Sequence, residues 1–541
     1  MHHGGTLAAT DITVHRGAGA ILERVSLAVT PGSRIGVVGP NGRGKTTLLR
    51  ALAGHEPLER GTVTRNPPTL RVGYLPQERD LGAGETLRSY LSRRTGIAEA
   101  EAKLDRLEAA LEQDPSATEA HSDALDRFLA LGGADFEARA ASTLAQVGLD
   151  VPLDRPAGEL SGGEQGRAPL ASILLARFDV YLLDEPTNDL DFAGLELLER
   201  WVIGVEAGVV LVSHDRTFLD RTVQSIVELE AGTDRVHVYA GGWSEYERER
   251  ERARADHERA YAQWTEERAR FGRLHRDRRE QARAGGKQAD RRGTHALMSK
   301  TRAAARRLER LDRARVEKPW QPWELKLQLA PRARSGDLVV ALENAVLARG
   351  AFRIGPLDLD VRWGERLSIA GPNGSGKTTV LDALLGRIPL DAGRRRVGPA
   401  VVFGEIAQER TAGAESLLAA FRRATGTSDG DARTLLAKFD LYAEHLDRPA
   451  ASLSPGERTR GELAVQAALG AGCLVLDEPT NHLDLPAVEE LERALQVFDG
   501  TLVLVTHDRR FLENVGITRV LELPARAAGP PTAPPRPRDR R

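Results

Sequence analysis

The 541-residue sequence has one cysteine and no long hydrophobic run. The single cysteine, Cys473, excludes an intramolecular disulfide and a zinc site built from cysteines. No run of about 18 apolar residues occurs, so we expect no transmembrane helix. Residues 1–5 lack the apolar core of a signal peptide. With 41% hydrophobic and 28% charged residues, the chain is predicted to be a cytoplasmic globular protein of several domains, with no stable membrane association.

Proline is absent from residues 243–318, so nothing in this segment forbids long helices. A glycine-rich break at residues 284–287 divides it. Apolar residues recur at helical spacings of three and seven before the break and of three, four and seven after it. These residues are Tyr261, Trp264, Phe271 and Leu274 before the break, and Leu297, Ala304, Leu308 and Leu311 after it. The pattern predicts two helices folded back on each other, with a loop over about residues 284–297 at the tip.

Acidic residues are scarce in the same segment. From Arg268 to Lys318 there are 18 Lys or Arg against 6 Asp or Glu, whereas the whole chain has a net charge of −2. A basic segment on an acidic body indicates a polyanionic partner, and nucleic acid fits best. The alternative is a solvated coiled coil of mixed charge. The side chains that we expect to contact nucleic acid are Arg283, Lys287, Arg291, Arg292 and Lys300.

Two stretches fit the phosphate-binding pattern G-x-x-x-x-G-K-[ST], at residues 39–46 and 371–378. The first follows a short apolar run, residues 34–38, that predicts a buried strand, and it opens a predicted helix. Backbone N–H groups of such a loop surround phosphate oxygens, the lysine supplies a positive charge, and the first threonine offers its hydroxyl to Mg²⁺. The predicted nucleotide-binding residues are Gly39, Asn41, Gly42, Gly44, Lys45, Thr46 and Thr47, with Gly371, Asn373, Gly374, Gly376, Lys377, Thr378 and Thr379 in the second copy.

An apolar strand ending in two carboxylates follows each phosphate-binding loop. Asp184 and Asp477 are placed to hold Mg²⁺, and Glu185 and Glu478, one residue later, to orient or deprotonate the attacking water. A second apolar strand ends in His214 or His507. A lone histidine is usually structural, but its place at a strand end favours a sensor of the γ-phosphate.

Two further elements complete each half. Gln77 and Gln408 suit a glutamine that reaches the metal and the water. A serine with glycines that opens a helix makes a second anion cradle, formed by Ser161, Gly162 and Gly163 or by Ser454 and Gly456. The predicted metal ligands are therefore Thr46, Gln77 and Asp184 in one half and Thr378, Gln408 and Asp477 in the other.

Along each half of the chain the motifs follow the order P-loop, glutamine, serine–glycine cradle, carboxylate pair and histidine. In this order they resemble the ATP-binding cassette ATPases. Two cassettes on one chain, no membrane segment and a basic helical segment between them resemble the ABC-F family of ribosome-binding ATPases. The resemblance implies an α/β fold of two P-loop cassettes joined by an antiparallel α-helical hairpin linker, with ATP and Mg²⁺ as cofactors. It also implies a monomer in which the cassettes pair head to tail, so that Lys45 faces Ser454 and Lys377 faces Ser161.

The same resemblance implies binding at the ribosomal exit site, with the hairpin reaching ribosomal RNA and P-site tRNA. ATP would favour the closed, bound state, and hydrolysis through Glu185 and Glu478 would permit release. Within the family, two functions compete: antibiotic resistance by ribosomal protection, as in actinobacterial macrolide-type proteins, and a general translation factor. The expectation favours resistance, with an indirect link to an antibiotic. A different class, the ATPase subunit of a membrane exporter, would need no basic hairpin, and a DNA-repair ATPase is a weaker alternative.

The two halves are not identical. Gln77 and Ser161 are 84 residues apart, but Gln408 and Ser454 only 46, which predicts a helical arm inserted near residues 90–135. The expected domains are residues 6–242, 243–320 and 337–525, followed by a disordered tail over residues 526–541.

Departures from the family pattern predict no strong selectivity for adenine and two unequal ATP sites. The stretches that correspond to the family's adenine-stacking aromatic, residues 14–17 and 347–350, contain no Phe or Tyr, and Arg16 and Arg349 could stack on the base instead. Pro455 removes a backbone N–H from the second signature, and Asp189 stands where the second half has His482.

Overall fold

The computed structural model describes residues 5–16, 19–76, 84–111, 115–160, 162–188, 190–229, 236–284, 291–318, 336–349, 352–406, 415–481 and 483–524. The chain divides into one unit that holds both cassettes and a second unit over Ser244–Pro322. Within the described residues, no helix combines the length and the hydropathy that crossing a bilayer requires.

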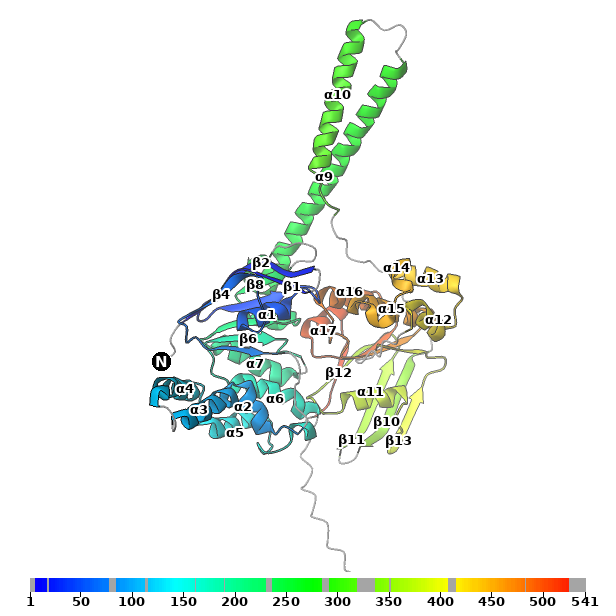
Figure 1. Ribbon diagram of the computed structural model, residues 1–541. Coiled ribbons are helices and arrows are strands. Elements are labelled where there is room, and N and C mark those ends of the chain that lie inside the picture. Colours follow the sequence, from blue (N-terminus) through cyan, green and yellow to red (C-terminus); the bar gives the residue numbers. More distant parts are fainter. Residues whose placement is uncertain are drawn as a thin grey trace, which may run out of the picture. The chain divides into compact units, whose positions relative to one another are not determined.

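The first cassette is built on a six-stranded sheet of order β5-β6-β7-β3-β8-β9. The strands pair in parallel except β9, which is antiparallel to β8. The predicted strand at residues 34–38 is β3, Arg34–Val38, and it leads into the P-loop and α1, Lys45–Ala53 (Figure 1). The other strands are β5 (Val72–Leu75), β6 (Val180–Asp184), β7 (Gly208–Val212), β8 (Ser225–Leu229) and β9 (Val236–Ala240).

A second, antiparallel sheet covers α1. It consists of β1 (Thr6–Arg16), β2 (Gly19–Val29) and β4 (Arg60–Asn66) in the order β2-β1-β4. Leu48 and Leu49 of α1 share one core with side chains of both sheets, so the helix that carries Lys45 is held from two sides.

Two helices of the first cassette lie in the segment where the sequence predicts an inserted arm, residues 90–135. Helices α3 (Ile97–Leu111) and α4 (Thr118–Ala130) lie between α2 (Leu87–Arg94) and α5 (Phe136–Gln146). In the second cassette the equivalent connection, between α12 and α13, is only residues 426–428. The remaining helices of the first cassette are α6 (Gly162–Leu175), α7 (Phe192–Gly204) and α8 (Arg216–Thr222).

The second cassette repeats the architecture. Its parallel sheet has the order β14-β15-β16-β12-β17, and its antiparallel sheet has the order β11-β10-β13. The strands are β10 (Leu338–Arg349), β11 (Phe352–Arg362), β12 (Arg366–Ala370), β13 (Ala392–Val397), β14 (Phe403–Ile406), β15 (Cys473–Asp477), β16 (Thr501–Val505) and β17 (Arg519–Glu522). The helices are α11 (Lys377–Leu385), α12 (Leu417–Thr425), α13 (Asp429–Lys438), α14 (Ala443–Leu446), α15 (Pro455–Leu469), α16 (Leu485–Gln496) and α17 (Arg509–Val515).

The side chains of β15 alternate between two buried faces of the sheet, which explains why this strand is apolar at almost every position. Cys473 and Val475 face the core shared with α11 and the antiparallel sheet. Leu474 and Leu476 face the core shared with α15, α16 and α17. Successive side chains of a strand point to opposite faces, so a sheet covered on both faces needs apolar residues throughout. Cys473 is thus a buried core residue, and the predicted α/β cassette fold is confirmed.

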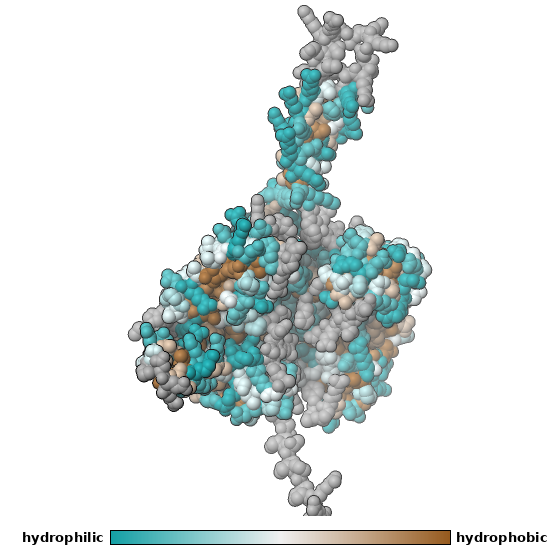
Figure 2. Space-filling view, viewed as in Figure 1, coloured by the Kyte–Doolittle hydropathy of each residue, from teal (hydrophilic) through white to brown (hydrophobic). Residues whose placement is uncertain are grey.

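The second unit contains most of α9, Trp243–Ala284, together with α10, Arg291–Arg313. The two helices run antiparallel: Trp264 Nε1 donates to the Leu311 carbonyl at 2.8 Å, and Arg307 Nε donates to Glu267 at 3.1 Å. The apolar face at their contact is narrow, with Ala304 and Leu311 buried. On the face that Figure 2 shows, the described surface of the two helices is largely hydrophilic.

One prediction for this unit is wrong. The loop expected over about residues 284–297 does not extend to 297, because α10 already begins at Arg291. Gly293 lies inside the helix, where glycine costs about 1 kcal/mol relative to alanine but does not end a helix that neighbouring residues favour. The tip residues 285–290 and the predicted disordered tail lie outside the described residues.

Candidate nucleotide-binding sites

Each P-loop lysine is buried and folded back onto its own loop. Lys45 Nζ donates to the carbonyls of Gly39 at 2.7 Å and Pro40 at 3.3 Å, and to Asn41 Oδ1 at 3.3 Å. Lys377 makes the same three contacts in the second cassette, at 2.8, 3.4 and 3.4 Å. Burial lowers the pKa of both lysines. An anion placed here would meet a largely desolvated ammonium group, which strengthens their attraction.

Glycine is required where the P-loop begins. Gly39 has φ 150°, and a Cβ there would lie 2.6 Å from the Leu229 carbonyl oxygen. Gly371 repeats the conformation, with φ 151° and the Leu523 carbonyl oxygen 2.8 Å from a Cβ. Helices α1 and α11 begin with no side-chain cap on their first N–H groups. These helix N-termini suit a phosphate, because unsatisfied N–H groups and the helix dipole both favour an anion.

The carboxylates at the ends of β6 and β15 lie against the P-loop threonines. Thr378 Oγ1 donates to Asp477 Oδ2 at 2.8 Å. In the first cassette Asp184 accepts from Thr46 and from Tyr74 Oη, the latter at 3.2 Å. Burial raises the pKa of Asp184 and Asp477. A hydroxyl beside a carboxylate, next to a phosphate-binding loop, is the oxygen donor set that Mg²⁺ prefers, so the residues present fit this ion.

Glu185 and Glu478 adopt the left-handed backbone conformation, with φ 50° and 45°. For a residue with a Cβ this conformation costs about 1–2 kcal/mol. It is held by hydrogen bonds from their N–H groups to the carbonyls of Val212 at 3.0 Å and Val505 at 2.8 Å. A strained local conformation of this kind is typical of functional sites.

The strand-end histidines face these glutamates. His214 Nε2 lies 3.1 Å from Glu185 Oε1, and His507 Nε2 lies 3.4 Å from Glu478 Oε1. Burial lowers the pKa of His214 to about 3 and that of His507 to about 4. Both imidazoles are therefore neutral near pH 7. A neutral ring can donate from one nitrogen and accept at the other, as a hydrogen-bonding sensor requires.

Each P-loop also contacts the opposite cassette. The Asn41 N–H donates to Asp484 Oδ2 at 3.0 Å, and the Asn373 N–H donates to Asp191 Oδ2 at 3.1 Å. The second oxygen of each aspartate caps its own helix, Asp191 on α7 at 3.0 Å and Asp484 on α16 at 3.3 Å. Each aspartate thus ties the start of a helix to the P-loop of the other cassette.

Some predicted site residues are not placed. Gln77, Gln408, Ser161, Asp189 and His482 lie outside the described residues, as does Lys287. The backbones of Arg283, Arg291, Arg292 and Lys300 are helical, but their side chains are also outside the described part of the chain. Their roles remain predictions.

The second signature is described. Ser454 caps α15, accepting from the Glu457 N–H at 3.2 Å while Glu457 accepts from the Ser454 N–H at 2.8 Å. Pro455 is the first residue of α15, where the missing N–H costs no intrahelical hydrogen bond. The proline is compatible with the helix, yet the signature still has one donor fewer to offer a phosphate. In the first cassette, Gly162 and Gly163 open α6.

Four residues of these sites were not predicted from the sequence: Tyr74, Asp191, Phe192 and Asp484. The ring of Phe192 packs edge-on against that of His507 in the other cassette, with centroids 5.2 Å apart. A signal for the aspartates was present, since the two are spaced 293 residues apart, like His214 and His507, and aspartate is a preferred residue at a helix N-cap.

Two P-loop sites on one chain, each contacted by an aspartate of the other half, define a protein with paired ATP-binding cassettes. The family model described as "ABC transporter" matches residues 22–188 and 354–481. Two solved structures share the fold: the RNase-L Inhibitor, with a TM-score of 0.57 at 20% identity over 95% of this chain and 87% of that one, and a structure titled "Model of ribosome-bound archaeal Pelota and ABCE1", with a TM-score of 0.56 at 21% identity over 93% and 74%.

The curated relatives narrow the class. The chain is 38% identical to the tylosin resistance ATP-binding protein TlrC of Streptomyces fradiae, over 91% of this chain and 92% of the relative. It is 32% identical to the energy-dependent translational throttle protein EttA of Escherichia coli K12, over 93% and 89%. It is 31% identical to ABC transporter F family member 2 of Arabidopsis thaliana, over 93% and 74%. The chain belongs to the ABC-F family, and both of its cassettes are of the kind that binds ATP.

Proposed function

We propose that this chain is an ATP-dependent ribosome-binding protein that protects the ribosome from an antibiotic. ATP hydrolysis would gate its binding and release at the ribosomal exit site. The observation that carries the ATP-dependent part is the reciprocal contact of each P-loop with the other cassette, through Asp191 and Asp484. A site built from both cassettes is complete only when they are closed, so nucleotide and closure are coupled.

Each predicted site residue has a proposed role in ATP hydrolysis. Lys45 and Lys377 would bind the phosphates, and Glu185 and Glu478 would orient the attacking water and accept its proton. His214 and His507, neutral and facing those glutamates, would hydrogen-bond near the γ-phosphate. Mg²⁺, held by Thr46 and Asp184 or by Thr378 and Asp477, would neutralise charge that develops on the phosphate oxygens.

A ribosomal partner is supported by charge and by the relatives. The basic stretch from Arg268 to Lys318 suits RNA phosphates and stacked bases. The relatives' names include a translational throttle and a tylosin resistance protein. The second name favours resistance to a drug that acts on the ribosome, and the first keeps a general role in translation as the other candidate.

The proposal is tested by ribosome pelleting and by drug susceptibility. With both catalytic glutamates changed to Gln, the protein should co-sediment with ribosomes in the presence of ATP and remain in the supernatant without it. Cells that express the parent protein should resist one class of ribosomal antibiotic, and cells that express a variant shortened over residues 285–294 should not. Co-sedimentation without any resistance would favour the translation-factor function. Association with membranes instead of ribosomes would favour the exporter subunit.

A further inference from the structure

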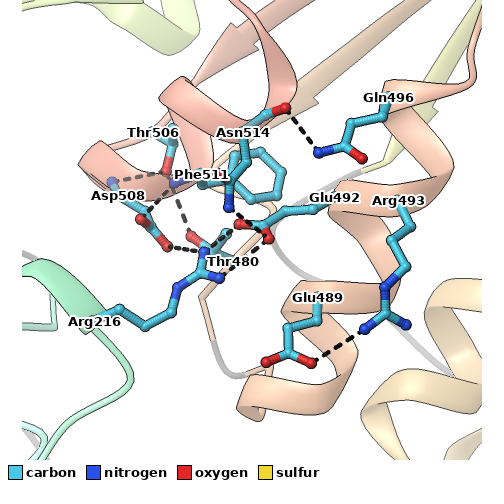
Figure 3. Close-up of polar contacts among 10 residues, drawn as sticks. All are labelled: Arg216, Thr480, Glu489, Glu492, Arg493, Gln496, Thr506, Asp508, Phe511 and Asn514. Carbon is cyan, nitrogen blue, oxygen red and sulfur yellow. Dashed lines mark hydrogen bonds and ion pairs between the residues drawn. The ribbon is translucent and has the colours of Figure 1, made fainter. Parts of the chain in front are cut away.

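Two arginines that none of the nucleotide-binding motifs explains cross between the cassettes. Arg216, the first residue of α8, comes two residues after His214 and is 2% exposed. Its guanidinium forms a bidentate ion pair with Glu492 of α16, in which Nη1 donates to Oε2 at 3.1 Å. Its Nη2 also lies 3.9 Å from Asp508 Oδ2 (Figure 3). Asp508 directly follows His507, so Arg216 of the first cassette contacts the residue next to the second cassette's histidine.

An equivalent arginine of the second cassette contacts the first cassette. Arg509, two residues after His507, donates to Glu199 of α7 at 3.1 Å. Its positive charge also lowers the pKa of Asp215, which burial raises, and Asp215 directly follows His214. Arg216 and Arg509, Glu492 and Glu199, and Asp508 and Asp215 each differ by 293 residues, as the two histidines do. The two clusters are equivalent by the internal repeat.

The aspartates connect the arginines to the histidines mechanically. Asp215 Oδ1 accepts from the Phe218 N–H at 2.9 Å and caps α8. Asp508 Oδ1 accepts from the Phe511 N–H at 2.9 Å and caps α17. A capping aspartate fixes the backbone between the end of the strand and the start of the helix, and the histidine lies in this segment. An arginine that holds the aspartate in place therefore also influences the position of the histidine.

Because the charged side chains of these contacts are buried, the contacts are specific to the state in which the two cassettes are paired. A guanidinium taken out of water is stable only with a carboxylate at good geometry, and separating such a pair leaves an uncompensated charge unless water returns. Burial raises the pKa of Asp508 to about 6, and Arg216 opposes that rise. The Arg216 cluster is therefore formed when the cassettes meet and is lost when they part.

The two clusters are built differently. Besides Arg216, Glu492 accepts from Asn514 Nδ2 at 3.0 Å, whereas Glu199, besides Arg509, accepts from Arg221 at 3.2 Å. The Arg509 side chain is 20% exposed, against 2% for Arg216. Arg509 also lies over the Phe192 ring, 5.5 Å from its centroid. Because the Arg216 pair is the more deeply buried, its loss should disturb closure more.

We infer that Arg216 and Arg509 are reciprocal positioning residues: each holds the segment beside the other cassette's histidine, so that neither ATP site is set for hydrolysis unless the cassettes are paired. The inference rests on the proposed ATPase function and names how its two sites are coupled. The arginines touch no reacting atom. Arg216 acts through Glu492 and Asp508. Arg509 acts through Glu199, which also accepts from Arg221 of α8, the helix that Asp215 caps.

The test replaces the arginines in the full-length protein and measures kcat and KM for ATP, together with the thermal unfolding midpoint. Arg216→Met should lower kcat by about tenfold or more, and Arg509→Met by a smaller factor, with KM changed less than kcat. Arg493→Met is the matched control, because Arg493 pairs with Glu489 of its own helix at 3.3 Å, and its kcat should equal the parent's. Arg216→Lys should recover part of the loss.

A double-mutant cycle separates positioning from folding. Arg216→Met combined with Glu492→Met removes both charges and keeps the volume, so the double variant should be at least as stable as Arg216→Met. Its kcat should be no lower than that of the worse single variant. Additive losses of kcat in the cycle would overturn the inference, as would losses that merely follow the unfolding midpoint.

A readout without turnover distinguishes this inference from the proposed function. Spin labels on cysteines introduced at the exposed residues Ile203 and Val397 would report the distance between the cassettes in the Glu185→Gln, Glu478→Gln background. ATP should shift the parent background to one short distance, and Arg216→Met should reduce that population. Equal closure in both would overturn the inference and leave the proposed function standing. Both the inference and the proposed function would be contradicted if ATP did not close this background and the unaltered protein did not hydrolyse ATP.

Discussion

At the scale of single residues, Glu185 and Glu478, the glutamates that we propose to be catalytic, combine a strained backbone with a histidine partner. Both stand one residue after a parallel strand in a conformation that residues with a Cβ rarely adopt, and both face a neutral histidine. Because these features recur at both positions, they indicate a requirement of the site.

The first prediction concerns these glutamates. Glu185→Gln combined with Glu478→Gln should bind ATP like the parent but lower kcat at least about 100-fold, because an amide cannot accept the water's proton. A phosphate-release assay at saturating ATP, with nucleotide binding measured separately, checks this. Glu444→Gln is the control, since its side chain is 79% exposed, and it should leave turnover unchanged. Turnover of the double variant near the parent rate would show that neither carboxylate handles the water.

The second prediction is that the two sites are unequal. Pro455 lies in only one of the two signatures. Tyr74 donates to Asp184, and Phe192 packs against His507. Among the described residues, neither contact has a counterpart at the other site. Lys45→Ala and Lys377→Ala should each abolish phosphate binding at one site and lower the ATPase rate by different factors. Steady-state rates of the two single variants at saturating ATP decide the matter, and equal losses would show that these differences are silent.

At the scale of elements, the P-loop depends on backbone conformation more than on side chains. The third prediction is that Gly39→Ala destabilises the fold by about 2 kcal/mol or more, since its φ of 150° and the Leu229 carbonyl leave no room for a Cβ. ATP binding should be lost with it. Gly158→Ala is the matched control, because a Cβ there would meet nothing within 4 Å. Denaturant titration of both variants is the measurement, and equal midpoints would contradict the prediction.

The elements around the sites could be predicted because their signals are local. The run at residues 34–38, the P-loop and the following helix lie within about twenty residues, and the structure places β3 and α1 there. The start of α10 could not be predicted. The helix propensity of the residues around Gly293 outweighs the cost of the glycine, and no apolar periodicity in the sequence marks this. The Arg216–Glu492 pair joins residues 276 positions apart, and no periodicity reports such a contact. What the sequence contained was only the repeat itself, with an arginine two residues after each histidine.

At the scale of the whole molecule, the proposed function assigns separate tasks to the basic segment and to the cassettes. The last prediction is that neutralising Arg283, Lys287, Arg291 and Arg292 to Gln weakens ribosome binding without changing ATP binding. Each phosphate that a cation neutralises releases counterions, so the logarithm of the binding constant should fall with the logarithm of salt concentration, and the variant's slope should be flatter by about 3. Pelleting over a range of salt concentrations measures that slope.

The chain offers a matched control for charge itself. Arg248, Arg254, Arg259 and Arg313 each pair with an acid three or four residues away on the same helix, so their positive charge is already compensated. Changing these four to Gln removes the same number of cations, yet the salt slope should stay close to the parent's. If both sets of four flattened the slope equally, the effect would come from net charge alone, and the tip would have no specific contact with RNA. If neither did, the helical unit would be a spacer between the cassettes.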